Sequence, residues 1–426
     1  MTGTDNSVKI NNNDTYTSAA ANTAEAENSG IRKKAINRGW KHNESQFIKP
    51  TDVVRLRGGI DRPMLAIIII LICFGSIMVF SSSYAFSLQK YGDSYHYIKN
   101  QIFFVAFGLV AMFFAMRFDY LWLRKLTPLI YGVTIVALIA VLVLGVAKGT
   151  AQRWIYIGSI SIQPSEIMKF SLIAMLARYI AINQDRITNY RNEKQARLYG
   201  AIFPLLIIGA ACGLVALERH LSGTIILFLI GAIIVFVSGA ALKWLFAAAG
   251  AVLLAFIPII AFTSYAQDRL KAFFNPESAD ALGDAWQTIQ GLNAIGSGGF
   301  LGVGLGNSLQ KHGYVPEPQN DFIFSIVCEE LGFVGAMVVV ALFVLFIWRG
   351  FIIALNAPDT FSTLVALGLV AKVALQAMLN ICVVTNLLPN TGIALPFFSY
   401  GGTATLMQLG EMGILLSISR YSYQKK

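Results

Sequence analysis

Apolar stretches long enough to cross a membrane recur along this chain from Met64 onward, and they constrain its fold more than any other feature. A helix needs about 20 mainly apolar residues to cross the hydrocarbon core of a bilayer. A segment that crosses lipid alone must be a helix, because only a helix satisfies its backbone hydrogen bonds internally. Apolar residues make up 56% of the 426 residues and charged residues only 13%, about half the usual share of charge. The sequence therefore predicts an all-α polytopic membrane protein and excludes a soluble fold.

Ten transmembrane helices are predicted. They cover about 64–80, 98–116, 126–147, 164–182, 199–217, 221–239, 242–262, 321–348, 360–385 and 396–419. Basic residues gather in alternate connections between these spans, as at Arg117, Arg124 and Lys125. Cytoplasmic loops carry the excess of Lys and Arg, so this pattern places both termini in the cytoplasm.

The two longest segments outside the predicted spans are an N-terminal tail and one loop. Residues 1–50 contain few large apolar residues, so we expect a disordered cytoplasmic tail before a single ten-helix membrane domain, 51–426. Residues 263–320 form a long extracytoplasmic loop between spans seven and eight, and a loop of that length usually has a function. Its run Trp286–Ile295 is amphipathic enough to lie on the membrane surface.

The charge pattern and the metal-binding residue types exclude several functions. The net charge of +10 arises from basic residues between apolar spans, without the aromatic interleaving of a nucleic-acid-binding module. The four cysteines fall in four separate apolar runs and the four histidines are isolated from one another, so no metal site or disulfide framework is predicted. The glycines at 302, 304 and 306 are not interpreted as a nucleotide-binding loop, because they follow no predicted strand and lack the lysine of such a loop.

Asp321 lies where the long loop meets the eighth span. A carboxylate that is partly desolvated at such a boundary is a better proton acceptor. Aspartate is also common near helix N-termini, where it satisfies backbone N–H groups without further function. The residues alone leave both interpretations open. Glu329 and Glu330 lie two turns deeper, where ionisable groups are functional candidates, and helical spacing points them in different directions.

A second candidate site lies at the start of the fourth span. Glu166 and Lys169 are spaced to pair on one helix face, and the pair could bind an anion, relay a proton or only fasten neighbouring helices. Just upstream, Arg153 and Trp154 fall near the outer membrane interface. Such a pair is often an interfacial anchor, and the alternative is a guanidinium group that clamps a phosphate.

Three further polar elements interrupt the apolar pattern. Glu218–His220 are interpreted as a hydrated outer turn between the fifth and sixth spans. Lys372, Gln376 and Asn380 recur every four residues on the ninth span, so they are expected to face other helices, most simply as structural contacts. The last outer turn, Leu395–Ala404, contains small residues that permit close approach by a ligand or a neighbouring helix.

Four ordered motifs resemble those of the SEDS family (shape, elongation, division and sporulation), which are polytopic bacterial cell-wall glycan polymerases. The motifs are AQRWIYIGSISIQPSEIMK at 151–169, ERHLSGT at 218–224, LGNSLQKHGYVPEPQNDFIFSIVCEELGFVG at 305–335 and LPFFSYGG at 395–402. The resemblance covers nearly all of residues 60–420 and is strongest to the cell-division branch and its sporulation relative. Many relatives carry Pro and Asp where this chain has Arg219 and His220.

The resemblance implies a peptidoglycan glycosyltransferase that polymerises lipid II at the outer face of the bacterial plasma membrane during cell division. By the family motif, Asp321 is the catalytic residue, which deprotonates the acceptor's sugar hydroxyl so that undecaprenyl pyrophosphate is released. Matching the other family motifs to this sequence in the same way implies these candidates for substrate binding: Arg153, Trp154, Glu166, Lys169, Lys311, Ser399 and Gly401.

The implied partners are a class B penicillin-binding protein with transpeptidase activity, other divisome proteins at the septum and membrane lipids, with no nucleic acid. No cofactor or metal site is predicted, and the sequence leaves open whether a divalent cation assists. Two other functions remain at this point. A flippase for the lipid-linked precursor could use intramembrane charges such as Glu166, Lys169, Glu330 and Lys372, and a non-catalytic divisome scaffold would need none of them.

Overall fold

The computed structural model describes residues 55–148, 151–157, 160–189, 192–241 and 284–423, with 243–244, 246–247, 250, 267, 269 and 273–274. The predicted tail 1–50, most of the predicted seventh span 242–262 and the first part of the predicted long loop lie outside the described residues.

Helices occupy nine of the ten predicted spans within the described part of the chain. They are α2 (Arg62–Tyr91), α3 (His96–Arg117), α4 (Tyr120–Leu144), α5 (Pro164–Ile187), α7 (Phe203–Leu217), α8 (Leu221–Val237), α12 (Ile323–Leu355), α13 (Thr360–Val384) and α14 (Gly402–Ser419). The short α6 (Glu193–Arg197) and the π-helix η1 (Leu198–Ile202) lead into α7, and α11 (Asp284–Ser297) precedes α12.

Six described segments are long and apolar enough to cross a membrane by length and composition: α2, α3, α4, the continuous stretch Glu193–Leu217, α12 and α13. The helix α8 is apolar but shorter. The helices α5 and α14 carry charged residues, among them Lys169 and Glu411. The chain is therefore a mostly helical, multi-pass membrane protein.

Local sequence signals set the helix boundaries. The side chain of Asp61 accepts a hydrogen bond from the Met64 N–H at 2.9 Å and so caps the start of α2. That helix ends at Gly92, which adopts the left-handed conformation with φ of 71°. At the start of α13, Asp359 and Ser362 form a reciprocal capping box.

Two small antiparallel sheets depart from the predicted all-α fold. The strands β2 (Val146–Lys148), β3 (Ala151–Ile157) and β4 (Ile160–Ile162) pair in that order between α4 and α5. The run Trp154–Ile157 alternates aromatic and β-branched residues, which favour a strand; it lies between two predicted spans, and the predicted all-α fold did not include it. The second sheet joins β1 (Arg55–Arg57) to β5 (Tyr421–Tyr423) near the two ends of the described chain.

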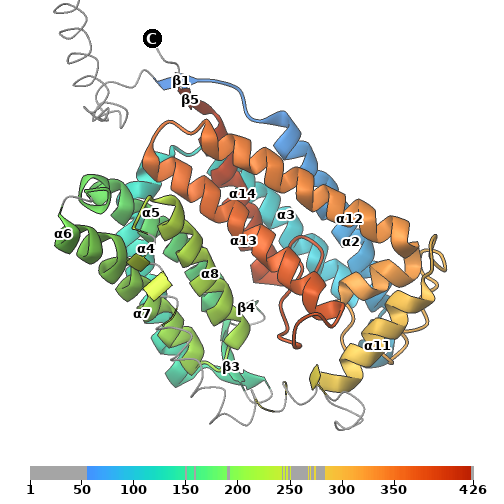
Figure 1. Cartoon of the computed structure of the whole chain (residues 1–426). Coiled ribbons are helices and arrows are strands. Elements are labelled where there is room, and N and C mark those ends of the chain that lie inside the picture. Colours follow the sequence, from blue (N-terminus) through green and yellow to red (C-terminus); the bar gives the residue numbers. More distant parts are fainter. Residues whose placement is uncertain are drawn as a thin grey trace, which may run out of the picture. The chain divides into compact units, whose positions relative to one another are not determined.

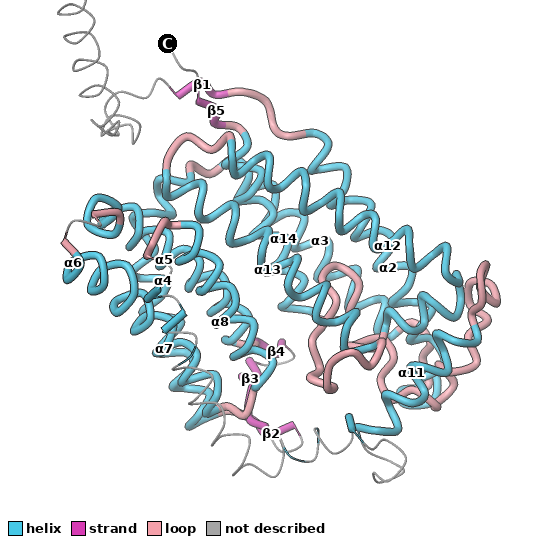
Figure 2. Tube along the Cα trace, viewed as in Figure 1, coloured by secondary structure: helices cyan, strands magenta, loops and turns pink. Residues whose placement is uncertain are grey.

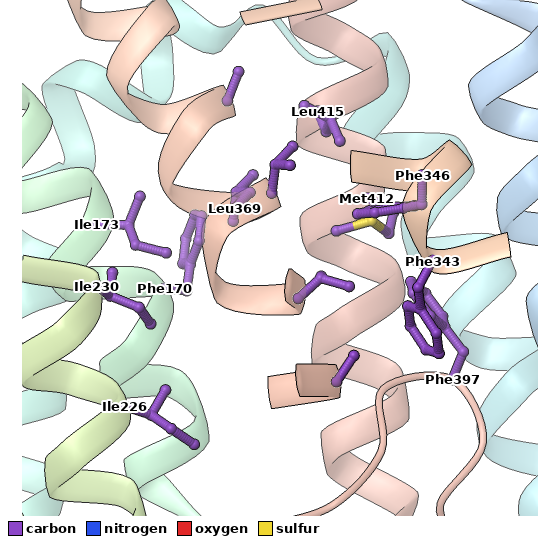
Figure 3. Close-up of a cluster of buried hydrophobic side chains, with 14 of the residues drawn as sticks. Phe170, Ile173, Ile226, Ile230, Phe343, Phe346, Leu369, Phe397, Met412 and Leu415 are labelled. Atoms are coloured by element: carbon purple, nitrogen blue, oxygen red, sulfur yellow. The ribbon is translucent and has the colours of Figure 1, made fainter. Parts of the chain in front are cut away.

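The two sheets lie at opposite ends of the helix bundle, as Figures 1 and 2 show. The end that carries α11 and β2–β4 is called the cavity end. Within the bundle α3 packs along α14, α12 packs on α2 and α13, and α5 contacts α4, α8 and α13. The middle is filled by buried apolar side chains such as Phe170, Leu369 and Met412 (Figure 3).

Candidate functional site

A cavity of about 920 Å³ opens at the cavity end of the bundle. Its walls come from the first turns of α3, α5 and α8, from strand β3, and from the segments that precede α12 and α14. Because all these helices begin at the same end, residues far apart in sequence converge on one space. Seven of the eight predicted site residues line it: Arg153, Trp154, Glu166, Lys169, Asp321, Ser399 and Gly401.

Asp321 is half-buried in the cavity wall and its backbone is held by α13. The Asn380 side-chain amide donates to the carbonyls of Asp321 and Ile393, each at 2.7 Å. The residue at the N-cap position of α12 is Phe322, so Asp321 lies one residue before that position. The contact also confirms that the polar stripe of α13 faces the protein, since Lys372, Gln376 and Asn380 are all buried.

Another wall of the cavity carries positive charge. Lys169 pairs with Glu166 at 2.7 Å, which confirms the predicted i, i+3 ion pair, and the Lys169 side chain is only 3% exposed. Arg153 projects from β3, and its guanidinium donates to the carbonyl of Arg219. Among the described residues, no group of three or more His, Cys, Asp or Glu side chains is placed to hold a metal ion.

The turn Glu218–His220 is not the hydrated connection that we predicted. Glu218 and His220 are buried, and only Arg219 is exposed. The Arg153 guanidinium holds the turn by donating to the Arg219 carbonyl. On the other side, His220 Nδ1 lies 3.3 Å from the Ser165 hydroxyl at the start of α5. The turn therefore folds over β3 and α5 instead of projecting into water.

Burial shifts the pKa values of Glu218 and His220, the two buried side chains of this turn. Burial, reinforced by the positive charge of Arg153, lowers the pKa of His220 to about 3, so this cavity-lining ring is neutral. Burial raises the pKa of Glu218 to about 8, although Arg153 opposes the change. Both Glu218 carboxyl oxygens are buried without a hydrogen-bond partner among the described residues.

Lys311 is the one predicted site residue that the structure does not bring to the cavity. Its side chain is fully buried, and its ammonium contacts Glu330 Oε1 at 2.7 Å and the Gly306 carbonyl at 2.6 Å. Glu330 also accepts a hydrogen bond from the Ser81 hydroxyl of α2 at 2.5 Å. Lys311 is thus committed to a protein carboxylate, and we drop it as a substrate-binding residue.

The loop that contains Lys311 is inserted into a kink of α12. Gly332 breaks the helix with φ of 66° and ψ of −164°. The amides of Val303 and Gly304 donate to the carbonyls of Glu329 and Glu330 at 3.0 and 2.9 Å, so the loop backbone replaces the missing helical bonds. The Glu329 carboxylate accepts from the Leu309 amide at 2.8 Å. Glu329 and Glu330 therefore have separate roles, as their helical spacing predicted.

Sequence reasoning missed several cavity residues, among them His96 and Asn100 at the start of α3, Gln287 of α11 and Tyr400. Only Tyr400 belongs to a motif that the sequence singled out. Sequence reasoning also predicted that Trp286–Ile295 could lie on the membrane surface, and it did not predict the packing of α11 against α12.

A bundle of apolar helices with a charged cavity at one end defines the class of polytopic membrane proteins. The family model of the FtsW, RodA and SpoVE proteins, described as cell cycle proteins, matches residues 62–424. The chain belongs to this family, which confirms the predicted SEDS resemblance.

Curated relatives match over most of their length. Stage V sporulation protein E of Bacillus subtilis (strain 168) is 38% identical over 365 residues, which cover 85% of this chain and 97% of the relative. The probable peptidoglycan glycosyltransferase FtsW of Trichlorobacter lovleyi is 37% identical over 365 residues, which cover 84% of this chain and 93% of the relative.

Solved structures share the fold. A chain of a peptidoglycan synthase complex that coordinates polymerization and crosslinking matches with a TM-score of 0.69 and 24% identity, over 85% of this chain and 98% of that chain. The rod shape determining protein RodA of Thermus thermophilus matches with a TM-score of 0.62 and 24% identity, over 86% of this chain and 98% of that chain.

Proposed function

We propose that this chain is a peptidoglycan glycosyltransferase that polymerises lipid II into glycan strands at the outer face of the bacterial plasma membrane during cell division. Membership of the family and the printed activity of the FtsW relatives support this function. The observation that carries it is the cavity itself, in which the half-buried carboxylate of Asp321 shares one space with Arg153 and Lys169.

The proposed topology has ten spans, with both termini in the cytoplasm and the cavity end outside. Within this arrangement 51–426 form one membrane domain; the predicted tail 1–50 and the first part of the predicted loop 263–320 lie outside the described residues. The basic residues Arg117 and Arg186 support it, because they close α3 and α5 at the end opposite the cavity. The cavity then opens to the leaflet in which the prenyl tail of the substrate is embedded.

The chemistry follows from the two sides of the cavity. Asp321 takes the proton from the acceptor's sugar hydroxyl, and the oxygen then attacks the anomeric carbon of the donor as a general base mechanism requires. The bond from that carbon to the pyrophosphate breaks, and undecaprenyl pyrophosphate leaves. Arg153 and Lys169 stabilise the negative charge that develops on the leaving group. Trp154, Ser399 and Gly401 contact the substrate, and Glu166 positions Lys169.

The structure favours this function over a flippase. A transporter needs access from both sides of the membrane, whereas in the described part of the bundle a cluster of buried apolar side chains fills the middle (Figure 3). Two of the charges considered for a transport path also lie outside the cavity, in buried ion pairs. Glu330 pairs with Lys311, and Lys372 pairs with Glu411 at 2.6 Å.

We further propose that a class B penicillin-binding protein cross-links the product and that both act with other divisome proteins at the septum. The structural neighbour from a complex that couples polymerization to crosslinking supports such a partner. The proposal assigns no cofactor; the positive charge of Arg153 lies in the same cavity as the Glu166–Lys169 ion pair, and participation of a divalent cation stays open.

The decisive test is Asp321→Asn in purified protein supplied with labelled lipid II. We expect polymerisation to fall by at least about 100-fold, because a positioned general base contributes roughly 10²–10⁴-fold. The matched control is Glu317→Gln, which removes a neighbouring carboxylate that lines the same cavity and should retain activity. Product is measured as glycan strands on a gel.

Each alternative function predicts a different result. Glycan strands made by Asp321→Asn would overturn the assignment of the base. A wild-type protein that moves lipid II across vesicles without polymerising it would be a flippase. A scaffold predicts that Asp321→Asn still supports division in cells.

A further inference from the structure

We propose that Tyr91, His96, Asn100 and Tyr400 form a binding surface for the sugar rings of the growing glycan strand. We call these four residues the aromatic rim. The inference rests on the proposed function, since a polymerase must hold the saccharide units that extend beyond the reacting pair. It adds a site of different chemistry from the charged wall that faces the pyrophosphate.

The four side chains form one connected surface. The rings of Tyr91 and His96 are stacked, with centroids 4.0 Å apart and planes at 16°. His96 Nε2 lies 3.5 Å from the Asn100 amide nitrogen, and Asn100 in turn hydrogen-bonds to the Tyr400 hydroxyl. Tyr97 supports the surface from below, because its buried ring meets Tyr400 edge-on at 4.9 Å.

The surface leads from the catalytic aspartate to the outside of the molecule. His96, Asn100 and Tyr400 line the same cavity as Asp321. The Tyr400 amide donates to the carbonyl of Gln319 at 2.8 Å, which ties it to the segment that carries Asp321. At the far end Tyr91 is 47% exposed. A strand that leaves the base along this wall would pass over all four side chains.

The chemistry of the aromatic rim suits a neutral sugar. Flat rings with polar edges bury apolar ligand faces while they keep hydrogen-bonding groups at the margin. The Asn100 amide, the Tyr400 hydroxyl and the His96 ring offer donors and acceptors for hydroxyl and acetamido groups. The nearby charges of Asp93 and Lys99 neutralise each other in an exposed ion pair at 2.9 Å. Lys90 places its ammonium 5.5 Å from the Tyr91 ring centre.

An alternative is that these rings only anchor the protein at the membrane interface, as Tyr and Trp often do. The same turn contains a residue that fits that role. Tyr95 is 54% exposed and stacks on Phe80 at 5.6 Å, whereas Tyr91 stacks on the cavity-lining His96; neither tyrosine lines the cavity itself. Tyr95 is therefore a matched control for Tyr91, because both are exposed tyrosines at the end of α2 and the start of α3.

The test compares the lengths of glycan strands made from lipid II by wild type, Tyr91→Ala, the double variant Tyr91→Ala/Asn100→Ala, and Tyr95→Ala. Strand lengths are read from gels at equal lipid II consumption. We expect Tyr91→Ala to shorten the median strand about threefold and the double variant about tenfold, in line with the loss of one stacking contact and one hydrogen bond. Tyr95→Ala should match wild type, and Tyr91→Phe should restore most of the length.

The outcomes separate this inference from the function on which it rests. Strands of wild-type length from the double variant would overturn the aromatic rim. Equal shortening by Tyr95→Ala and Tyr91→Ala would also overturn it, in favour of an interfacial anchor. If wild type makes no strands, the proposed function itself fails. A second measurement uses Asp321→Asn protein and a soluble tetramer of β-1,4-linked N-acetylglucosamine, whose binding should weaken severalfold when Tyr91→Ala is added.

Discussion

Glu218 shows how one buried side chain can make this protein sensitive to pH. It follows the last residue of α7, has 1% exposure and lies near the positive charge of Arg153. Burial raises its pKa from 4.5 to about 8. The folded protein thus holds this proton more tightly than the unfolded chain does. The stability that the proton provides is complete below pH 4.5 and is lost as the pH rises through about 8.

We predict that Glu218→Gln removes part of this pH dependence. Each unit of pKa difference corresponds to about 1.4 kcal/mol, so the melting temperature of wild type should fall by a few degrees more than that of the variant between about pH 5 and pH 9. Thermal unfolding in detergent at a series of pH values measures the difference. Parallel curves for the two proteins would contradict the buried, protonated state of Glu218.

At the scale of single residues, the sequence located the cavity well but not every member of it. Asp321, Glu166 and Lys169 stand at helix starts within distinctive motifs, and such positions share one end of a bundle. The sequence did not indicate that Lys311 lies outside the cavity, because its ammonium pairs with Glu330, a contact made through the loop that packs into the kink of α12. His220 was assigned to a hydrated turn because the contact that holds this turn, from Arg153 to the Arg219 carbonyl, comes from a strand that was not predicted.

The contact between the Gly-rich loop and α12 depends on backbone approach that only glycine permits. A Cβ atom on Gly302, whose φ is +81°, would lie 2.2 Å from the Glu330 carbonyl oxygen. Gly306 has a similar φ of +85°, but no atom lies within 4 Å of the position its Cβ would take. The two glycines therefore share a left-handed backbone conformation, but only Gly302 lies so close to α12 that a side chain would collide with it.

We predict that Gly302→Ala destabilises the protein much more than Gly306→Ala. Both substitutions carry the strain of a left-handed residue, about 1–2 kcal/mol, and only Gly302→Ala must also displace the loop from the kink. The readouts are thermal unfolding and polymerisation rate. Equal effects of the two substitutions would show that the close approach contributes nothing.

At the scale of elements, apolar runs predicted the helices because length and hydrophobicity decide membrane insertion locally. The strands β2–β4 were missed because a short run such as Trp154–Ile157 carries little signal beside long apolar spans. The packing of α11 was missed for a related reason. Its amphipathic pattern fits either a lipid surface or the flank of α12, and only the tertiary structure chooses between them.

The ion pair of Lys372 and Glu411 joins α13 to α14 in the interior of the bundle. Their side chains are 2% and 1% exposed. Removing one partner leaves an uncompensated buried charge, whereas replacing both with uncharged groups is often tolerated.

We predict that Glu411→Gln lowers the free energy of unfolding by about 3–5 kcal/mol. The double variant Lys372→Met/Glu411→Gln should recover most of that loss. Denaturant unfolding of wild type, both single variants and the double variant gives the coupling energy. Strictly additive losses would show that the two side chains do not act as a pair.

At the scale of the whole molecule, the sequence predicted a multi-pass bundle and the burial of Lys372, Gln376 and Asn380. It did not predict which helices touch. The partner of Lys372 is Glu411, which lies 39 residues away on another helix, and no local pattern specifies that choice. The pairing of α3 with α14 depends in the same way on side-chain fit between distant segments.

The kink at Gly332 has a consequence for how the chain enters the membrane during synthesis. An isolated α12 would expose the carbonyls of Glu329 and Glu330 to hydrocarbon, because its own helical ladder is interrupted there. The amides that satisfy them belong to residues 303–304, which leave the ribosome before α12 does. The kink therefore becomes fully hydrogen-bonded only when residues 303–304 have packed against it, so the two segments complete their structure together.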